Sequence, residues 1–170
     1  MIYELNNFLT LDECNNFIYE IENSKVKTNF TDSGKFDNKK WINTELAEKF
    51  YRKLETYPIY EGERILRPNN LIMSGKYNVG DSFSLHTDTG LFYDRKAQEK
   101  SLWTLLIYLN DNFKGGETVF YDDFWKIDKI VKPIMGTAIL FDIDLWHCGN
   151  ELLKGTKYWI GCEIIGKFKN

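Results

Sequence analysis

The sequence predicts an α+β fold in which two N-terminal helices precede a jelly roll or barrel of short strands. Two segments with helical periodicity come first, a run of β-rich segments follows from Ile65, and Gly and Pro residues separate those segments. At 170 residues, 43% hydrophobic and 16% aromatic, the chain is expected to form one folded domain over residues 1–170. We divide it into a helical N-terminal support at about 1–60 and a jelly-roll core at about 64–166.

The first helix is expected over about 11–22. Thr10 and Glu13 have the spacing of a capping box, and apolar residues then recur on one helical face. A polar loop with a short strand at its start is expected over 25–43. A second helix is expected near 44–56, where apolar residues again lie one turn apart.

The remaining segments read as short strands separated by turn residues. Two helices followed by such a run favour α+β. The expected strands are 71–78, 83–87, 102–109, 117–121, 128–132, 137–142 and 156–165.

Charge and cysteine content exclude several classes of function. The net charge of −3 offers no basic field for nucleic acid or a membrane surface. No apolar run approaches the ~20 residues of a membrane span, and the start lacks a signal-like segment, so a cytoplasmic location is expected. Three cysteines without a Cys-x-x-Cys pair indicate reduced thiols.

A His-x-Asp pair at His86 and Asp88 predicts a metal site. On an extended strand, residues two apart point to the same face, so one imidazole and one carboxylate can meet at one point. These are two of the three ligands of the facial triad that holds non-haem Fe(II) with open positions. The chain has two histidines, so a missing histidine ligand could only be His147.

Four blocks of residues occur in an order that is typical of one enzyme family. The blocks are Tyr77, Gly80, His86 and Asp88; Tyr108–Asn110 with Gly115–Phe120; Lys132, Pro133, Gly136, Leu140 and Phe141; and His147 with Gly155–Lys157. On these residues the chain resembles the prolyl 4-hydroxylase-type branch of the Fe(II)/2-oxoglutarate-dependent dioxygenases. The resemblance covers roughly residues 70–165.

The resemblance implies a double-stranded β-helix, a jelly-roll variant, with the N-terminal helices packed on one sheet. It implies Fe(II) as the metal, 2-oxoglutarate and O2 as co-substrates, and ascorbate as an accessory. His86, Asp88 and His147 would be the iron ligands, Lys157 would pair with the distal carboxylate of 2-oxoglutarate, and Tyr77 and Thr118 would hydrogen-bond it. The implied substrate is a prolyl or other amino-acid residue in a peptide or protein.

Two positions depart from the family pattern. Phe83 stands where many members carry Tyr, and Glu163 stands where many carry Trp. With period-2 alternation Glu163 shares a face with Lys157, and a buried carboxylate needs a partner, so a cationic substrate is expected. Alternatively, a bulge near Gly161 would turn Glu163 out to water.

Other functions remain open at this point. They are a nucleic-acid or free amino-acid oxygenase of the same superfamily, a catalytically silent jelly-roll binding module, and a zinc hydrolase with the same three ligands. The polar segment 89–101 reads either as a lid over the substrate mouth, with Gly90 as hinge, or as a surface loop.

Overall fold

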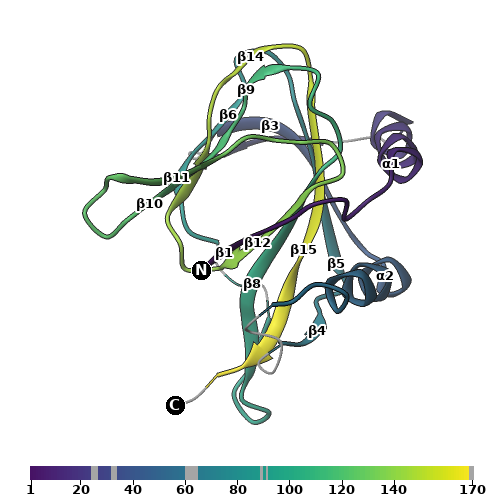
Figure 1. Ribbon diagram of the computed structural model, residues 1–170, viewed down its shortest axis with the longest axis vertical. Coiled ribbons are helices and arrows are strands. Elements are labelled where there is room, and N and C mark those ends of the chain that lie inside the picture. Colours follow the sequence, from purple (N-terminus) through teal and green to yellow (C-terminus); the bar gives the residue numbers. More distant parts are fainter. Residues whose placement is uncertain (24–26, 32–33, 60–64, 89, 91, 169–170) are drawn as a thin grey trace.

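The computed structural model describes residues 1–23, 27–31, 34–59, 65–88, 90 and 92–168 (Figure 1). Two helices and fifteen strands occur within these residues. In chain order they are β1 (Ile2–Leu5), α1 (Leu11–Asn23), β2 (Lys27–Thr31), β3 (Gly34–Ile42), α2 (Thr44–Leu54), β4 (Ile65–Pro68), β5 (Leu71–Tyr77), β6 (Ser82–His86), β7 (Tyr93–Asp94), β8 (Glu99–Tyr108), β9 (Lys114–Gly115), β10 (Thr118–Tyr121), β11 (Ile127–Val131), β12 (Ala138–Asp142), β13 (His147–Gly149), β14 (Leu152–Lys154) and β15 (Lys157–Lys167).

Most strands join one antiparallel sheet of thirteen strands. Its order is β1-β12-β8-β15-β5-β3-β6-β13-β10-β11, while β2, β4 and β7 add to β3, β15 and β8. β14 and β9 form a separate two-stranded sheet. The large sheet curls, so that β6 and β10 lie across the molecule from β8 and β15 (Figure 1). Residues of all four of these strands line one cavity.

Strand alternation divides the buried side chains between two sides of the sheet. On β15, Ile160, Cys162 and Ile164 belong to a hydrophobic cluster that also contains buried residues of α1, α2, β5 and β8. The alternate positions, including Lys157 and Glu163, line an interior cavity. This period-2 pattern is the one expected for strands with two different faces. The charged side chains of Lys157 and Glu163 thus lie on the inner face of β15.

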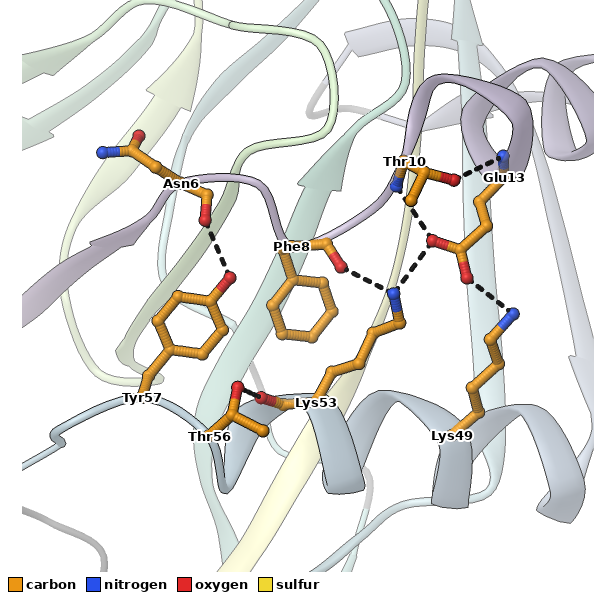
Figure 2. A network of polar contacts seen from close by, with 8 residues as sticks. All are labelled: Asn6, Phe8, Thr10, Glu13, Lys49, Lys53, Thr56 and Tyr57. Atoms are coloured by element: carbon orange, nitrogen blue, oxygen red, sulfur yellow. Dashed lines mark hydrogen bonds and ion pairs between the residues drawn. The ribbon is translucent and has the colours of Figure 1, made fainter.

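The capping box that the sequence predicts at Thr10 and Glu13 forms at the start of α1 (Figure 2). The Thr10 backbone N–H donates to Glu13 Oε2 at 2.9 Å, and the Glu13 N–H donates to Thr10 Oγ1 at 3.2 Å. Lys53 and Lys49 of α2 reach the same carboxylate, at 2.9 Å each. Burial raises the pKa of Glu13, but the hydrogen bonds from the two lysines and from the Thr10 N–H outweigh this effect. The pKa of Glu13 is therefore lowered to about 2. The box thus joins α1 to α2 as well as starting α1.

The short strand expected at the start of the segment 25–43 is confirmed by β2, but the loop expected over the rest of the segment is wrong. Residues 27–31 and 34–42 form β2 and β3, and β3 pairs with β5 and β6 inside the large sheet. The segment is polar, so it has no hydrophobic alternation, and non-local pairing decides its structure. With β1, it also makes the N-terminal third partly β rather than helical.

Other strands were missed because they are short. These are β1, β4, β7, β9, β13 and β14. Part of the segment 89–101 lies outside the described residues. Within it, Tyr93–Asp94 pairs with Glu99–Lys100 as a hairpin of β7 and β8.

The three cysteines are free. No helix within the described ranges has both the length and the apolar character that a membrane crossing requires.

Candidate active site

Three potential metal ligands converge where β6 meets β13. The two strands pair so that His147 lies directly opposite His86. The Asp88 backbone N–H donates to the Ile143 carbonyl at 3.1 Å, which holds the carboxylate beyond the end of β6. Asp88 Oδ1 lies 3.5 Å from His86 Nε2 and 4.0 Å from His147 Nε2. One ligand atom from each residue lies within 4.8 Å of the others.

Backbone carbonyls orient both imidazoles. His86 Nδ1 lies 2.8 Å from the Ser84 carbonyl oxygen, and His147 Nδ1 lies 2.9 Å from that of Leu145. A carbonyl only accepts, so each Nδ1 carries a proton, and in a neutral ring the lone pair is then on Nε2, on the Asp88 side. Burial lowers the pKa of His147, which favours the neutral ring. Two neutral imidazoles and one carboxylate fit a divalent iron.

Thr104 on β8 fixes the carboxylate of Asp88. Its Oγ1 donates to Asp88 Oδ2 at 2.5 Å, which leaves Oδ1 on the side of the two histidines. Burial raises the pKa of Asp88, but the neighbouring imidazoles and the Thr104 hydroxyl outweigh it and lower the pKa. The carboxylate is therefore held ionised, as a metal ligand must be.

Lys157 lies inside the same cavity. Its side chain is 4% exposed, and Nζ donates to the Gly116 carbonyl at 2.7 Å. Nζ also lies 5.2 Å and 5.5 Å from the ring centroids of Tyr77 and Tyr108. Burial lowers the pKa of Lys157 to about 8. An ammonium has three N–H groups, so this site can pair with a buried anion.

Tyr77 and Thr118 line the same cavity as Lys157. Tyr77 faces Lys157 directly across β5 and β15 and is buried. The Tyr108 hydroxyl donates to Thr118 Oγ1 at 2.7 Å, and Thr118 lines the cavity. The predicted co-substrate residues thus lie together, on three different strands.

Phe83 and Glu163 both line the cavity, whose volume is about 390 Å³. The Phe83 ring lies 3.9 Å, centroid to centroid, from that of His86. Glu163 is 3% exposed, and Ser101 Oγ donates to its Oε2 at 2.5 Å. The expectation that this carboxylate depends on the substrate for a partner is therefore wrong, because β8 supplies one. The expected alternative, a bulge near Gly161, is also wrong: β15 pairs with β8 in unbroken register from Trp159 to Ile164.

Sequence reasoning missed three residues of this site, namely Ser101, Thr104 and Tyr108. All lie on β8, and Thr104 and Tyr108 share its inner face by period-2 spacing. That spacing could have placed Thr104 and Tyr108 on the same face of the strand from the sequence alone. Their hydrogen-bond partners were not predictable, because they depend on which strands β8 faces across the interior.

Comparisons with known proteins place the chain in a family. The family model of the 2OG-Fe(II) oxygenase superfamily matches residues 72–162. A probable prolyl 4-hydroxylase 6 of Arabidopsis thaliana is 33% identical over 123 residues, which are 55% of this chain and 42% of the plant protein. The chain thus spans less than half of that relative's length.

Solved structures show the same fold. The viral collagen prolyl hydroxylase of Paramecium bursaria Chlorella virus-1 has a TM-score of 0.73 at 21% identity, covering 97% of this chain and 96% of the viral one. A Pseudomonas putida prolyl-4-hydroxylase has a TM-score of 0.73 at 11% identity, covering 99% and 93%. A Trichoplax adhaerens prolyl hydroxylase, in complex with a hypoxia inducible factor peptide fragment, has a TM-score of 0.70 at 18% identity. The match covers 97% of this chain and 83% of the Trichoplax one. The fold is therefore the jelly roll of these oxygenases.

Proposed function

Since the chain belongs to the 2OG-Fe(II) oxygenase superfamily, we propose that it is an Fe(II)- and 2-oxoglutarate-dependent hydroxylase of the prolyl 4-hydroxylase type. Its substrate in this proposal is a prolyl or other amino-acid residue in a peptide or protein. The observation that carries the proposal is one cavity that contains both the His86, Asp88 and His147 cluster and the buried ammonium of Lys157.

In this proposal His86, Asp88 and His147 hold the iron through two Nε2 atoms and Oδ1. Bound Fe(II), with 2-oxoglutarate and O2, supplies the oxidising chemistry that replaces a substrate C–H with C–OH. The carbonyls of Ser84 and Leu145 keep both Nε2 lone pairs available. Outer partners of this kind orient ligands and raise their basicity.

Lys157, Tyr77 and Thr118 would hold the distal carboxylate of 2-oxoglutarate. Lys157 supplies a positive charge in a buried place, where a charge-assisted hydrogen bond is strong. The Tyr108 hydroxyl donates to Thr118, so Thr118 can donate its own proton to the carboxylate. Together these groups would fix the co-substrate's position relative to the metal ligands.

The aromatic wall would exclude water from the reacting atoms. Phe83 packs on His86, while Phe120 and Phe141 pack on His147 with ring centroids 5.6 Å and 4.9 Å away. Apolar neighbours of this kind strengthen the electrostatic contacts inside a site. The two helices would support the sheet of β5, β8 and β15 from the outside, so that its inner face stays rigid.

The rival functions explain fewer of these residues. A silent binding module has no need of three converging ligands beside a buried lysine, and a zinc hydrolase leaves the Lys157 site without a use. A nucleic-acid oxygenase would need a basic face, which the net charge of −3 does not favour. A free amino-acid oxygenase would keep every site residue, so only substrate tests separate it from the proposal.

Incubation with Fe(II), 2-oxoglutarate and O2 tests the proposed function. Succinate should form, and mass spectrometry across a panel of peptides and free amino acids should find a product that has gained one oxygen atom. Asp88→Ala should form no succinate, while the exposed Asp144→Ala should behave as wild type. Succinate formation by Asp88→Ala at the wild-type rate, or none by wild type with any substrate, would refute the proposal.

A further inference from the structure

An indole on β15 lies beside the phenol of Tyr77. Trp159 follows Lys157 on the inner face of β15, and both residues line the cavity. Trp159 pairs with Gly75 of β5, two positions from Tyr77. Trp159 and Tyr77 are therefore diagonal neighbours on one face of the sheet, a spacing that aromatic side chains can bridge. Trp159 also packs against the buried cluster that contains Tyr77.

Gly75 gives the indole its place over β5. A β-carbon at residue 75 would collide with Nε1 and the adjoining ring carbons of Trp159, so only glycine leaves room for the ring. On its other side Trp159 pairs with Tyr108 of β8, which is large and fully buried. The nitrogen-bearing edge of the indole therefore lies over β5, the strand that carries Tyr77.

Trp159 donates a hydrogen bond to the Tyr77 hydroxyl. Burial raises the pKa of Tyr77, and the hydrogen bond from Trp159 opposes that rise. An indole N–H can only donate, so the Tyr77 oxygen accepts and the phenol keeps its own proton for another acceptor. The same oxygen lies beside Gly149, where a β-carbon would be 3.7 Å away. The hydroxyl thus reaches across the interior to β13, the strand that carries His147.

Thr118 has an aromatic donor of the same kind. The Tyr108 hydroxyl donates to Thr118 Oγ1 at 2.7 Å, so Thr118 also keeps its own proton for another acceptor. A hydroxyl that accepts one hydrogen bond donates the next one more strongly, because hydrogen bonds in a chain polarise one another. Tyr77 and Thr118 are therefore both prepared to donate to a carboxylate beside Lys157.

We propose that Trp159 is a positioning residue for 2-oxoglutarate and acts through Tyr77. Its N–H holds the phenol so that the Tyr77 proton is directed at the distal carboxylate. This inference rests on the proposed function and adds a residue to its co-substrate site. The N–H of Trp159 should accordingly matter only while the Tyr77 hydroxyl is present.

A double-mutant cycle on 2-oxoglutarate binding tests this inference, measured by calorimetric titration of the Mn(II)-loaded protein without turnover. Trp159→Phe keeps an aromatic ring and removes the N–H, and it should weaken binding by about 2- to 10-fold, the contribution of one neutral hydrogen bond. Tyr77→Phe should weaken binding at least as much. In Tyr77→Phe, the added Trp159→Phe should cause no further loss, because the acceptor is already gone. Trp125→Phe, at an exposed indole, is the matched control and should bind as wild type does.

Gly75→Ala provides an independent variant, because its methyl group displaces the indole. It should weaken 2-oxoglutarate binding by about the same factor as Trp159→Phe and leave the Mn(II) dissociation constant unchanged. Wild-type affinity for 2-oxoglutarate in Gly75→Ala, Trp159→Phe or Tyr77→Phe would overturn the inference. An equal loss from Trp159→Phe with and without the Tyr77 hydroxyl would also overturn it, since that loss would not pass through Tyr77.

Succinate formation by the wild-type protein tests the proposed function separately. Wild type that forms succinate, together with an additive cycle, would refute the role of Trp159 and leave the proposed function in place. Wild type that binds 2-oxoglutarate with the expected cycle but forms no succinate with any substrate would refute the proposed function and keep the contact between Trp159 and Tyr77.

Discussion

Replacing Lys157 with alanine should weaken 2-oxoglutarate binding by about 10- to 150-fold. The side chain is 4% exposed, and a hydrogen bond to a charged group contributes about 1.5–3 kcal/mol. At about 1.4 kcal/mol per tenfold, that energy gives the stated range. Calorimetric titration of the Mn(II)-loaded protein measures it. The exposed Lys154→Ala is the matched control and should bind as wild type does.

The change in 2-oxoglutarate affinity with pH provides a second, independent test of the role of Lys157. Burial lowers the pKa of Lys157 from 10.5 to about 8, so the free protein loses this positive charge as the pH rises through about 8. One pH unit above that pKa, about a tenth of the molecules keep the ammonium, and affinity should fall about tenfold. Lys157→Arg keeps its charge throughout and should show no such fall.

Two results would refute this reasoning. Unchanged affinity in folded Lys157→Ala would mean that the lysine does not contact 2-oxoglutarate. An equal loss of affinity with pH in wild type and Lys157→Arg would mean that another group titrates.

Two further predictions concern the support of the site and of the fold. Thr104→Val should weaken Mn(II) binding by about 10- to 100-fold, because it removes the donor to Asp88 Oδ2. Thr118→Val is the control and should leave the Mn(II) dissociation constant unchanged. Equal dissociation constants in wild type and both variants would contradict this role of Thr104. The pKa of Glu13 is lowered from 4.5 to about 2, so its contribution to stability is complete above pH 4.5 and is lost as the pH falls to about 2. Urea unfolding against pH should show this acid loss in wild type and in the exposed Glu20→Gln, and Glu13→Gln should lack it; the same acid loss in Glu13→Gln would contradict the assignment.

Residue spacing predicted the elements whose hydrophobic pattern is local. Helix α1 and its capping box follow from Thr10, Glu13 and one apolar stripe, and β15 follows from a long β-rich run. The position of Glu163 on the inner face also follows from period-2 alternation. Each of these features depends only on neighbours in the chain.

Features that depend on distant partners were not predictable in this way. β3 is polar, with Asn38 and Lys40 among its residues, and it is held in the sheet by pairing with β5. The role of Thr104 depends on Asp88, 16 positions away, and that of Ser101 depends on Glu163, 62 positions away. The order of strands in the sheet decides such contacts, and no local pattern contains that order.

Thermal unfolding with Mn(II) tests the central claim, the three-ligand centre, most directly. A ligand at 100 times its dissociation constant stabilises the folded state by about 2.7 kcal/mol, which for a chain of this size corresponds to a rise in Tm of about 5–10 °C. Wild type should show this rise, and His86→Ala, Asp88→Ala and His147→Ala should each lose it while remaining folded. A rise of wild-type size in any one of the three variants would remove that residue from the ligand set and contradict the centre described above.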